Sequence, residues 1–144
     1  MRAVVTRVSS AMVEVDGVVT GKIDTGLLVL LGIRIDDTGA DAKKLASKIC
    51  NLRIFCDENG KMNLDLRATG GSLLVVSQFT LYADTSSRRP GFTEAARPET
   101  AIPLYELFMQ ECRDLGFTVE AGVFGAMMDV HSVNDGPVTI ILES

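Results

Sequence analysis

The side chains best placed to do chemistry stand at the end of a predicted buried strand. The run Ser72–Val76 is almost wholly apolar, and Ser77, Gln78 and Thr80 follow it directly. Sites in α/β proteins form beyond strand ends, where such side chains could hydrogen-bond a substrate. Ordinary strand-end hydrogen bonding explains the same residues equally well on spacing alone.

A hydroxyl nucleophile needs a neighbouring base, and the sequence offers none beside Ser77 or Thr80. His131 is the only histidine and stands far away in sequence, and no G-x-S-x-G elbow is present. The remaining route is electrostatic, because backbone N–H groups at a strand end can stabilise an oxyanion without an acidic or basic side chain.

Asp135-Gly136-Pro137 is a second distinctive stretch. Proline has no N–H and cannot stand inside a central strand ladder, and glycine reaches backbone angles closed to other residues. Local sequence therefore favours an exposed turn that joins two apolar strands. The alternative is a rigid backbone probe, including a cis peptide bond, which is uncommon before proline. Upstream, Phe124 and Met128 suit a core, but glycine-flanked Phe124 could also wall a small pocket.

Composition narrows the class of protein. The 144 residues carry a formal net charge of −5, so a grip on a long nucleic-acid duplex is not expected, and Arg88, Arg89 and Arg97 are the only clustered basic residues. The three cysteines form no C-x-x-C pair, and one histidine cannot build a multi-imidazole metal site, so we expect no metal and no cofactor. With neither a signal-peptide pattern nor a membrane span, a cytoplasmic protein is expected.

Hydrophobic periodicity predicts a single domain over residues 1–144. Apolar runs at 27–33 and 72–79 read as buried strands, and helical spacing predicts helices over 40–52 and 98–115. Further strands are expected at 3–8, 11–15, 18–23, 53–55, 61–64 and 117–120, with loops at 68–71 and 82–98. Two helices cannot cover this much sheet. The predicted class is therefore α/β, α+β-like, layered sheet/sheet/helix, with mixed β-sheets and two main helices.

Two motifs together, Ser77–Asp84 and Asn134–Thr139, closely resemble the D-aminoacyl-tRNA deacylase family. The resemblance spans essentially the whole chain and includes Gly26–Gly32, Asn51–Phe55 and Phe124-Gly125-Ala126. The chain departs from the family pattern at Gly91, before Phe92, and at Met127, where a polar residue is common.

The resemblance implies a homodimer that hydrolyses the ester between a D-amino acid, or glycine, and the terminal adenosine of tRNA. Ser77, Gln78, Phe79 and Thr80 would line the pocket, with backbone donors around Phe79 at the oxyanion. A cis Gly136-Pro137 bond would enter the partner's site and sterically reject L-amino acids, beside the Phe124 and Met128 wall. The ribose 2′-hydroxyl of the RNA would assist catalysis.

Two other functions stay open at this point. The lack of acid–base side chains fits a non-catalytic module that binds an RNA end or an aminoacyl group. A conventional esterase with Ser77 or Thr80 as nucleophile is the second.

Overall fold

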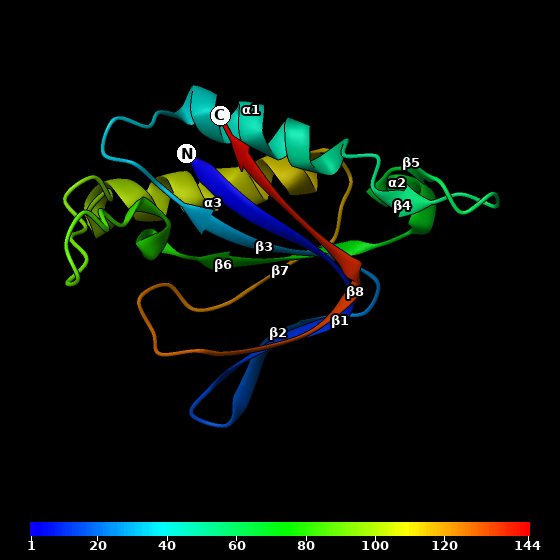
Figure 1. Cartoon of the computed structure of the whole chain (residues 1–144), viewed down its shortest axis with the longest axis horizontal. Helices are drawn as coiled ribbons and strands as arrows, with labels where there is room; N and C mark the ends of the chain where they lie inside the picture. The colour runs from blue at the N-terminus through cyan, green and yellow to red at the C-terminus, as the bar shows by residue number, and fades with distance from the viewer.

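The computed structural model describes all residues from Met1 to Ser144 (Figure 1). The main sheet contains β1 (Arg2–Val15), β2 (Val18–Ile23), β3 (Gly26–Gly32), β6 (Ser72–Ser77), β7 (Val119–Ala121) and β8 (Asp129–Glu143). A small ribbon is formed by β4 (Phe55–Cys56) and β5 (Met62–Leu64). The helices are α1 (Gly39–Cys50), α2 (Leu66–Thr69), α3 (Pro98–Asp114) and the 3₁₀ turn η1 (Phe79–Tyr82).

Strand β1 organises the sheet because it pairs with three other strands. Its first half, Arg2–Val8, runs antiparallel to β3, and its second half, Ala11–Val15, runs antiparallel to β2. Strand β8 pairs with both halves on the other edge. On the far side of β3, β6 and β7 are added in parallel, so the sheet is mixed.

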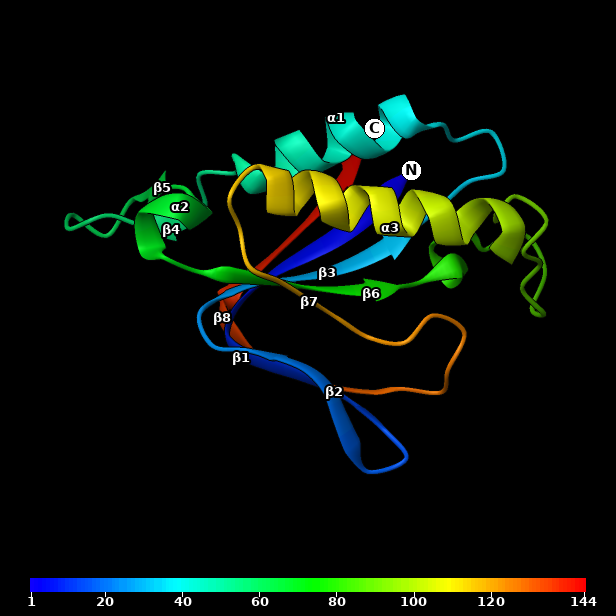
Figure 2. The ribbon, with the colours of Figure 1, turned by 180° about the vertical axis from the view of Figure 1, so that it is seen from behind.

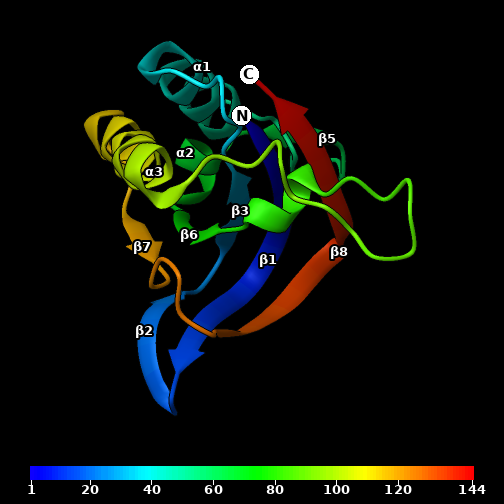
Figure 3. The ribbon, with the colours of Figure 1, turned by 90° about the vertical axis from the view of Figure 1, so that its left-hand side faces the viewer.

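The long β1 bends, and the hairpin of β1 and β2 folds back under β3 and β6 (Figure 3). A core cluster with Val13, Leu28 and Leu74 fills the space between these two β layers. The approach is close: a Cβ added to Gly21 in β2 would lie 2.5 Å from the carbonyl oxygen of Ala121 in β7. The larger core, with Leu45 and Phe108, lies on the opposite face, under α1 and α3 (Figure 2).

The predicted layered fold class and both main helices are confirmed, with the two β layers formed by halves of one bent sheet. Several local predictions were wrong. Residues 2–15 form one strand without a break, and the strand expected at 53–55 begins only at Phe55. The loop expected at 68–71 overlaps helix α2. The Asp65 carboxylate caps this helix by accepting a hydrogen bond from the N–H of Ala68. None of the helices is long and apolar enough to span a membrane.

The predicted turn at Gly136-Pro137 was also wrong, because both flanking segments belong to the single strand β8. Asn134 pairs with Val8 and Thr139 pairs with Thr6, so Arg7 alone faces residues 135–138. The extra residues bulge from the ladder, which is how a strand accommodates a proline without an N–H. We call residues 135–138 the corner.

Candidate functional site

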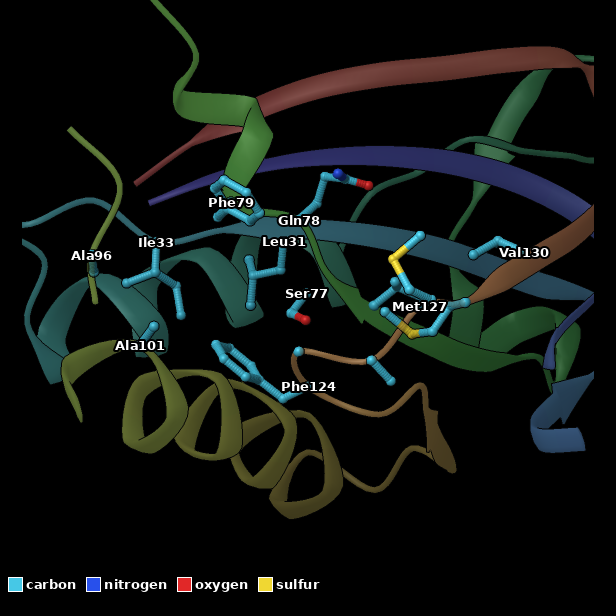
Figure 4. A pocket seen from close by; sticks show the side chains of 14 residues that line it. Leu31, Ile33, Ser77, Gln78, Phe79, Ala96, Ala101, Phe124, Met127 and Val130 are labelled. Carbon is cyan, nitrogen blue, oxygen red and sulfur yellow. The ribbon is translucent and has the colours of Figure 1, made fainter. Parts of the chain in front are cut away.

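A cavity of about 330 Å³ lies at the carboxyl end of β6, and we call it the strand-end cavity (Figure 4). Eleven of its 14 lining residues are hydrophobic. The lining comes from the ends of β3 and β6, from η1, from α3 and the loop before it, from the segment between β7 and β8, and from the start of β8. The lining residues are Leu31, Ile33, Val76, Ser77, Gln78, Phe79, Ala96, Ala101, Phe124, Gly125, Ala126, Met127, Met128 and Val130.

The parallel pairing of β3 and β6 places the polar strand end. Leu31 is in register with Ser77, and the carbonyl oxygen of Leu31 accepts a hydrogen bond of 2.8 Å from the N–H of Gln78. The chain then turns into η1, with Phe79 as its first residue. The N–H of a first helical residue has no partner inside its helix. The Phe79 N–H is therefore a candidate donor to a bound oxyanion.

Five of the predicted site residues line the cavity together: Ser77, Gln78, Phe79, Phe124 and Met128. Thr80 does not line it. Its exposed hydroxyl oxygen accepts a hydrogen bond from the Gln78 side-chain amide. Thr80 is thus placed to orient Gln78 rather than to touch a molecule in the cavity.

Tyr105 of α3 supports the cavity wall and was missed from sequence. Its hydroxyl donates a hydrogen bond of 2.9 Å to the carbonyl oxygen of Val75 in β6, and its ring packs edge-on against Phe124 with centroids 5.9 Å apart. Burial raises the pKa of Tyr105 to about 12. Tyr105 lies four residues after Ala101 on the buried face of α3, and this spacing was the available signal.

No ionisable side chain lines the strand-end cavity. His131 lies on β8 with its Nε2 atom 3.8 Å from Glu14 Oε2, and its side chain is 53% exposed. A Ser-His-Asp site with Ser77 is therefore not assembled within the chain. Chemistry in this cavity depends on hydroxyl, amide and backbone groups, or on groups that a bound molecule brings.

The corner lies outside the cavity of its own chain, since neither Gly136 nor Pro137 is among the lining residues. Both residues are exposed, and the peptide bond between them is cis, as the family resemblance implies. Asn134 pins the corner from its base: its side-chain oxygen accepts from the N–H of Val138 at 3.1 Å, and its amide donates to Thr139 Oγ1 at 3.3 Å.

Beneath the corner lies Arg7, which sequence reasoning also missed. Its side chain is buried and donates hydrogen bonds to the carbonyl oxygens of Asp135, at 3.0 Å, and Ile54, at 2.6 Å. The signal was the strand alternation, because Ala3, Val5 and Arg7 share one face of β1 and the first two are fully buried. A charged residue on a buried face needs partners, and here the corner supplies one.

Exposed apolar side chains continue along the chain from the cavity lining into the start of β8. Met127 is 92% exposed, Val133 is 57% exposed, and Val130 lies between them in sequence at 40%. Sequence reasoning named Met127 only as a departure from the family pattern. An apolar patch of this kind, next to a cavity, is typical of an interaction surface.

Comparisons with known proteins agree on one family. The profile of the family described as D-Tyr-tRNA(Tyr) deacylase matches residues 4–143. The chain is similar to a D-aminoacyl-tRNA deacylase of Roseiflexus castenholzii, with 60% identity over 100% of this chain and 92% of the relative. It is also similar to a D-aminoacyl-tRNA deacylase of Thermus aquaticus, with 57% identity over 100% of this chain and 95% of the relative.

Two solved structures share the fold. A c-Myc DNA unwinding element binding protein superposes with a TM-score of 0.95 and 41% identity over 100% of this chain and 99% of that one. A probable eukaryotic D-amino acid tRNA deacylase superposes with a TM-score of 0.86, covering 99% of this chain and 98% of that one. At 15% identity, the second likeness concerns the fold alone.

Proposed function

The chain belongs to the D-Tyr-tRNA(Tyr) deacylase family, and from that premise we propose that it is a hydrolase that cleaves the ester of D-aminoacyl-tRNA. Free tRNA and the D-amino acid are the products, and glycyl-tRNA is a further candidate substrate. The observation that carries the proposal is the strand-end cavity: it is predominantly apolar, has no ionisable lining residue, and is lined by Phe79, the first residue of η1. Such a site suits a neutral ester on an adenosine.

In this proposal the adenine and the ester occupy the strand-end cavity. Ser77 and Gln78 supply its polar side chains, and the Phe79 N–H stabilises the oxyanion that develops on the ester carbonyl. Thr80 acts through Gln78, because its hydroxyl oxygen accepts a hydrogen bond from the Gln78 side-chain amide. The direct test is release of tyrosine from D-Tyr-tRNA by catalytic amounts of the protein, and no release above the spontaneous rate would overturn the proposal.

The RNA itself completes the catalytic machinery, since the cavity lining contains no side chain able to act as a general base. The 2′-hydroxyl of the terminal ribose is adjacent to the ester in the substrate and is the assisting group that we propose. D-Tyr-tRNA ending in 2′-deoxyadenosine should bind but turn over far more slowly. Equal turnover of the two substrates would contradict the RNA-assisted mechanism.

We further propose that the enzyme works as a cytoplasmic homodimer in which the corner enters the partner's strand-end cavity. The exposed Gly136 and Pro137 lie outside their own cavity, and the apolar surface of Met127, Val130 and Val133 is available for a partner. In the partner's site the corner backbone would bind the substrate amino group and leave no room for an L side chain. A D side chain points away from it.

Mixed dimers test the cross-subunit arrangement. One chain would carry Ala126→Trp, which fills the strand-end cavity, and the other Gly136→Ala, which displaces the corner. Each homodimer should lose most of its activity, whereas the mixed dimer keeps one site with an intact cavity and an intact corner. Recovery of activity on mixing is the expected result, and persistent inactivity would assign the corner to its own chain's site.

A further inference from the structure

Two exposed aromatic rings meet at the mouth of the strand-end cavity. Phe79 and Phe92 pack edge to face, with ring centroids 5.1 Å apart and planes at 71°. Phe79 is 56% exposed and Phe92 is 37% exposed. Paired rings that remain this open to water offer free faces for another planar group.

Phe92 lines a second hollow, which we call the outer hollow, of about 510 Å³. Ala96 lines both the outer hollow and the strand-end cavity, so the two spaces are neighbours. The outer hollow also presents the side chains of Thr93, Arg97 and Thr100, with Glu99 as its only carboxylate. The outer hollow therefore offers space, directly beside the cavity, for the next part of a molecule bound there.

Phe92 is held in place on both sides. Asp84 and Gly91 exchange two backbone hydrogen bonds of 2.8 and 2.9 Å, which close the loop of residues 85–90 that projects from the body in Figure 3. After Phe92, the N–H of Ala95 donates to the Phe92 carbonyl at 3.2 Å, and the N–H of Ala96 donates to Ile33 at 2.9 Å. Phe92 therefore stands at the anchored base of the loop, where a preorganised ring loses little entropy on binding.

The charge near this ring pair suits an anion. Arg88 and Arg89 precede Phe92 in the same loop, and Arg97 lines the outer hollow. None of the three guanidinium groups takes part in the chain's ion pairs. The nearby Glu94 is paired with Arg34. Arg97 thus lies in the same hollow as the exposed Phe92 ring, and a cationic group combined with an exposed aromatic ring is a combination that binds single-stranded nucleic acid.

We propose that Phe92, together with Phe79, forms the stacking surface for the base of the nucleotide that precedes the terminal adenosine of the RNA. This inference rests on the proposed function, which places that adenosine in the strand-end cavity. The preceding nucleotide then leaves the cavity past Ala96, with its base on the ring pair and its phosphate beside Arg97. The contact is a stacking contact and reads no base edge, so it tolerates any base.

The test is a binding measurement with two hydrolysis-resistant probes. In both probes D-tyrosine is joined by an amide bond to a 3′-terminal adenosine. One further nucleotide is linked to the 5′ side of this adenosine, and it is cytidine in one probe and an abasic ribose in the other. The charges are equal, so the ratio of the two dissociation constants isolates the base. Stacking predicts that the cytidine probe binds roughly 5- to 150-fold more tightly.

Variants assign the effect to Phe92. Phe92→Ala should bring the ratio close to one, and Phe92→Tyr should keep it. Leu115→Ala is a matched control, because Leu115 is 38% exposed at the far end of α3. A ratio near one in the unmodified protein, or a ratio unchanged by Phe92→Ala, would overturn the stacking proposal, and so would failure to bind either probe.

Turnover of D-Tyr-tRNA is measured separately from these affinities. If the protein turns over D-Tyr-tRNA but binds both probes equally well, only the stacking proposal is overturned and the proposed function stands. If the cytidine probe binds more tightly but D-Tyr-tRNA is not hydrolysed, the proposed hydrolase activity is overturned and a surface that binds an RNA end remains.

Discussion

The guanidinium group of Arg7 lies under the carbonyl oxygen of Asp135, with Nε donating across 3.0 Å, and so ties the first strand to the exposed corner. The same side chain donates to Ile54 at 2.6 Å and pairs with the Asp135 carboxylate at 3.4 Å. A buried, multiply bonded arginine is a rigid support, because its planar fork holds several acceptors at fixed directions. The corner is exposed but is not left to move freely.

Replacement of Arg7 by lysine should weaken both the fold and the chiral selection. A single ammonium group cannot reach Ile54 and Asp135 in the same geometry, so a buried carbonyl oxygen loses its donor. The expected loss in the free energy of unfolding is about 1–3 kcal/mol, measured by urea titration. The ratio of D-Tyr-tRNA to L-Tyr-tRNA hydrolysis should also fall. Unchanged selectivity in a folded Arg7→Lys protein would separate Arg7 from the corner's proposed role.

Gly136→Ala should damage the site more than the fold. Gly136 has φ +137°, and an added Cβ would lie 2.8 Å from both the N and Cγ2 atoms of Val138, so the backbone of the corner must shift. A shift of about 1 Å can cost a factor of about 100 in rate. We expect a loss of that order in kcat/KM for D-Tyr-tRNA.

Gly17→Ala is the matched control for this variant. Gly17 also has a positive φ, +76°, but an added Cβ there meets nothing within 4 Å. Gly17→Ala carries the cost of a positive φ without a clash, so it should lose some thermal stability and keep its activity, while Gly136→Ala loses activity. Equal activity in the two proteins would count against any part for Gly136 in substrate selection.

Thr80→Ala distinguishes a positioning hydroxyl from a nucleophile. Loss of a true nucleophile costs about 10⁴-fold or more in kcat. Thr80 does not line the cavity, and its hydroxyl oxygen accepts a hydrogen bond from the Gln78 side-chain amide. We therefore expect Thr80→Ala to lower kcat by about tenfold or less, which is about 1.4 kcal/mol. Ser77→Ala, measured in the same assay, covers the second hydroxyl. A loss near 10⁴-fold in either variant would restore the conventional esterase.

The raised pKa of Tyr105 should make the free energy of unfolding depend on pH in the alkaline range. Its pKa is raised to about 12 by burial, whereas an unfolded tyrosine titrates near 10. The folded state therefore keeps a proton that the unfolded state loses, and stability should be level below about pH 10 and fall between about pH 10 and 12. Urea titrations across this range measure the fall.

Tyr105→Phe provides the comparison. It removes the hydrogen bond to Val75, which should cost about 1 kcal/mol at neutral pH. It should also make the alkaline fall shallower, although not flat, because burial raises the pKa of Tyr82 to about 12 as well. An alkaline profile identical to that of the unmodified protein would contradict the assignment to Tyr105.

Much of the fold could be predicted because local signals agreed with the tertiary structure. The apolar runs at 27–33 and 72–79 became β3 and β6, and the helical spacing at 40–52 and 98–115 became α1 and α3. The site residues at the end of β6 followed from the same logic, since a buried strand that ends in Ser77 and Gln78 brings polar groups to one edge of the sheet.

The missed features depended on contacts between distant segments. The chain around Gly136-Pro137 carries turn signals, and only the pairing of β8 with both halves of β1 makes it a bulge in one strand. Arg7 follows Ala3 and Val5 on the apolar face of the strand pattern, but its charge argues against burial until Asp135 and Ile54 are placed beside it as hydrogen-bond partners. Phe92 lies in an irregular loop, and its place in the candidate site follows only from its ring contact with Phe79.

The most direct test of D-specific hydrolysis is a comparison of matched D-Tyr-tRNA and L-Tyr-tRNA, each incubated with catalytic amounts of the protein. The D-ester should be cleaved, and the L-ester should decay only at its spontaneous rate. Cleavage of both esters would contradict steric rejection by the corner, and cleavage of neither would contradict the hydrolase itself.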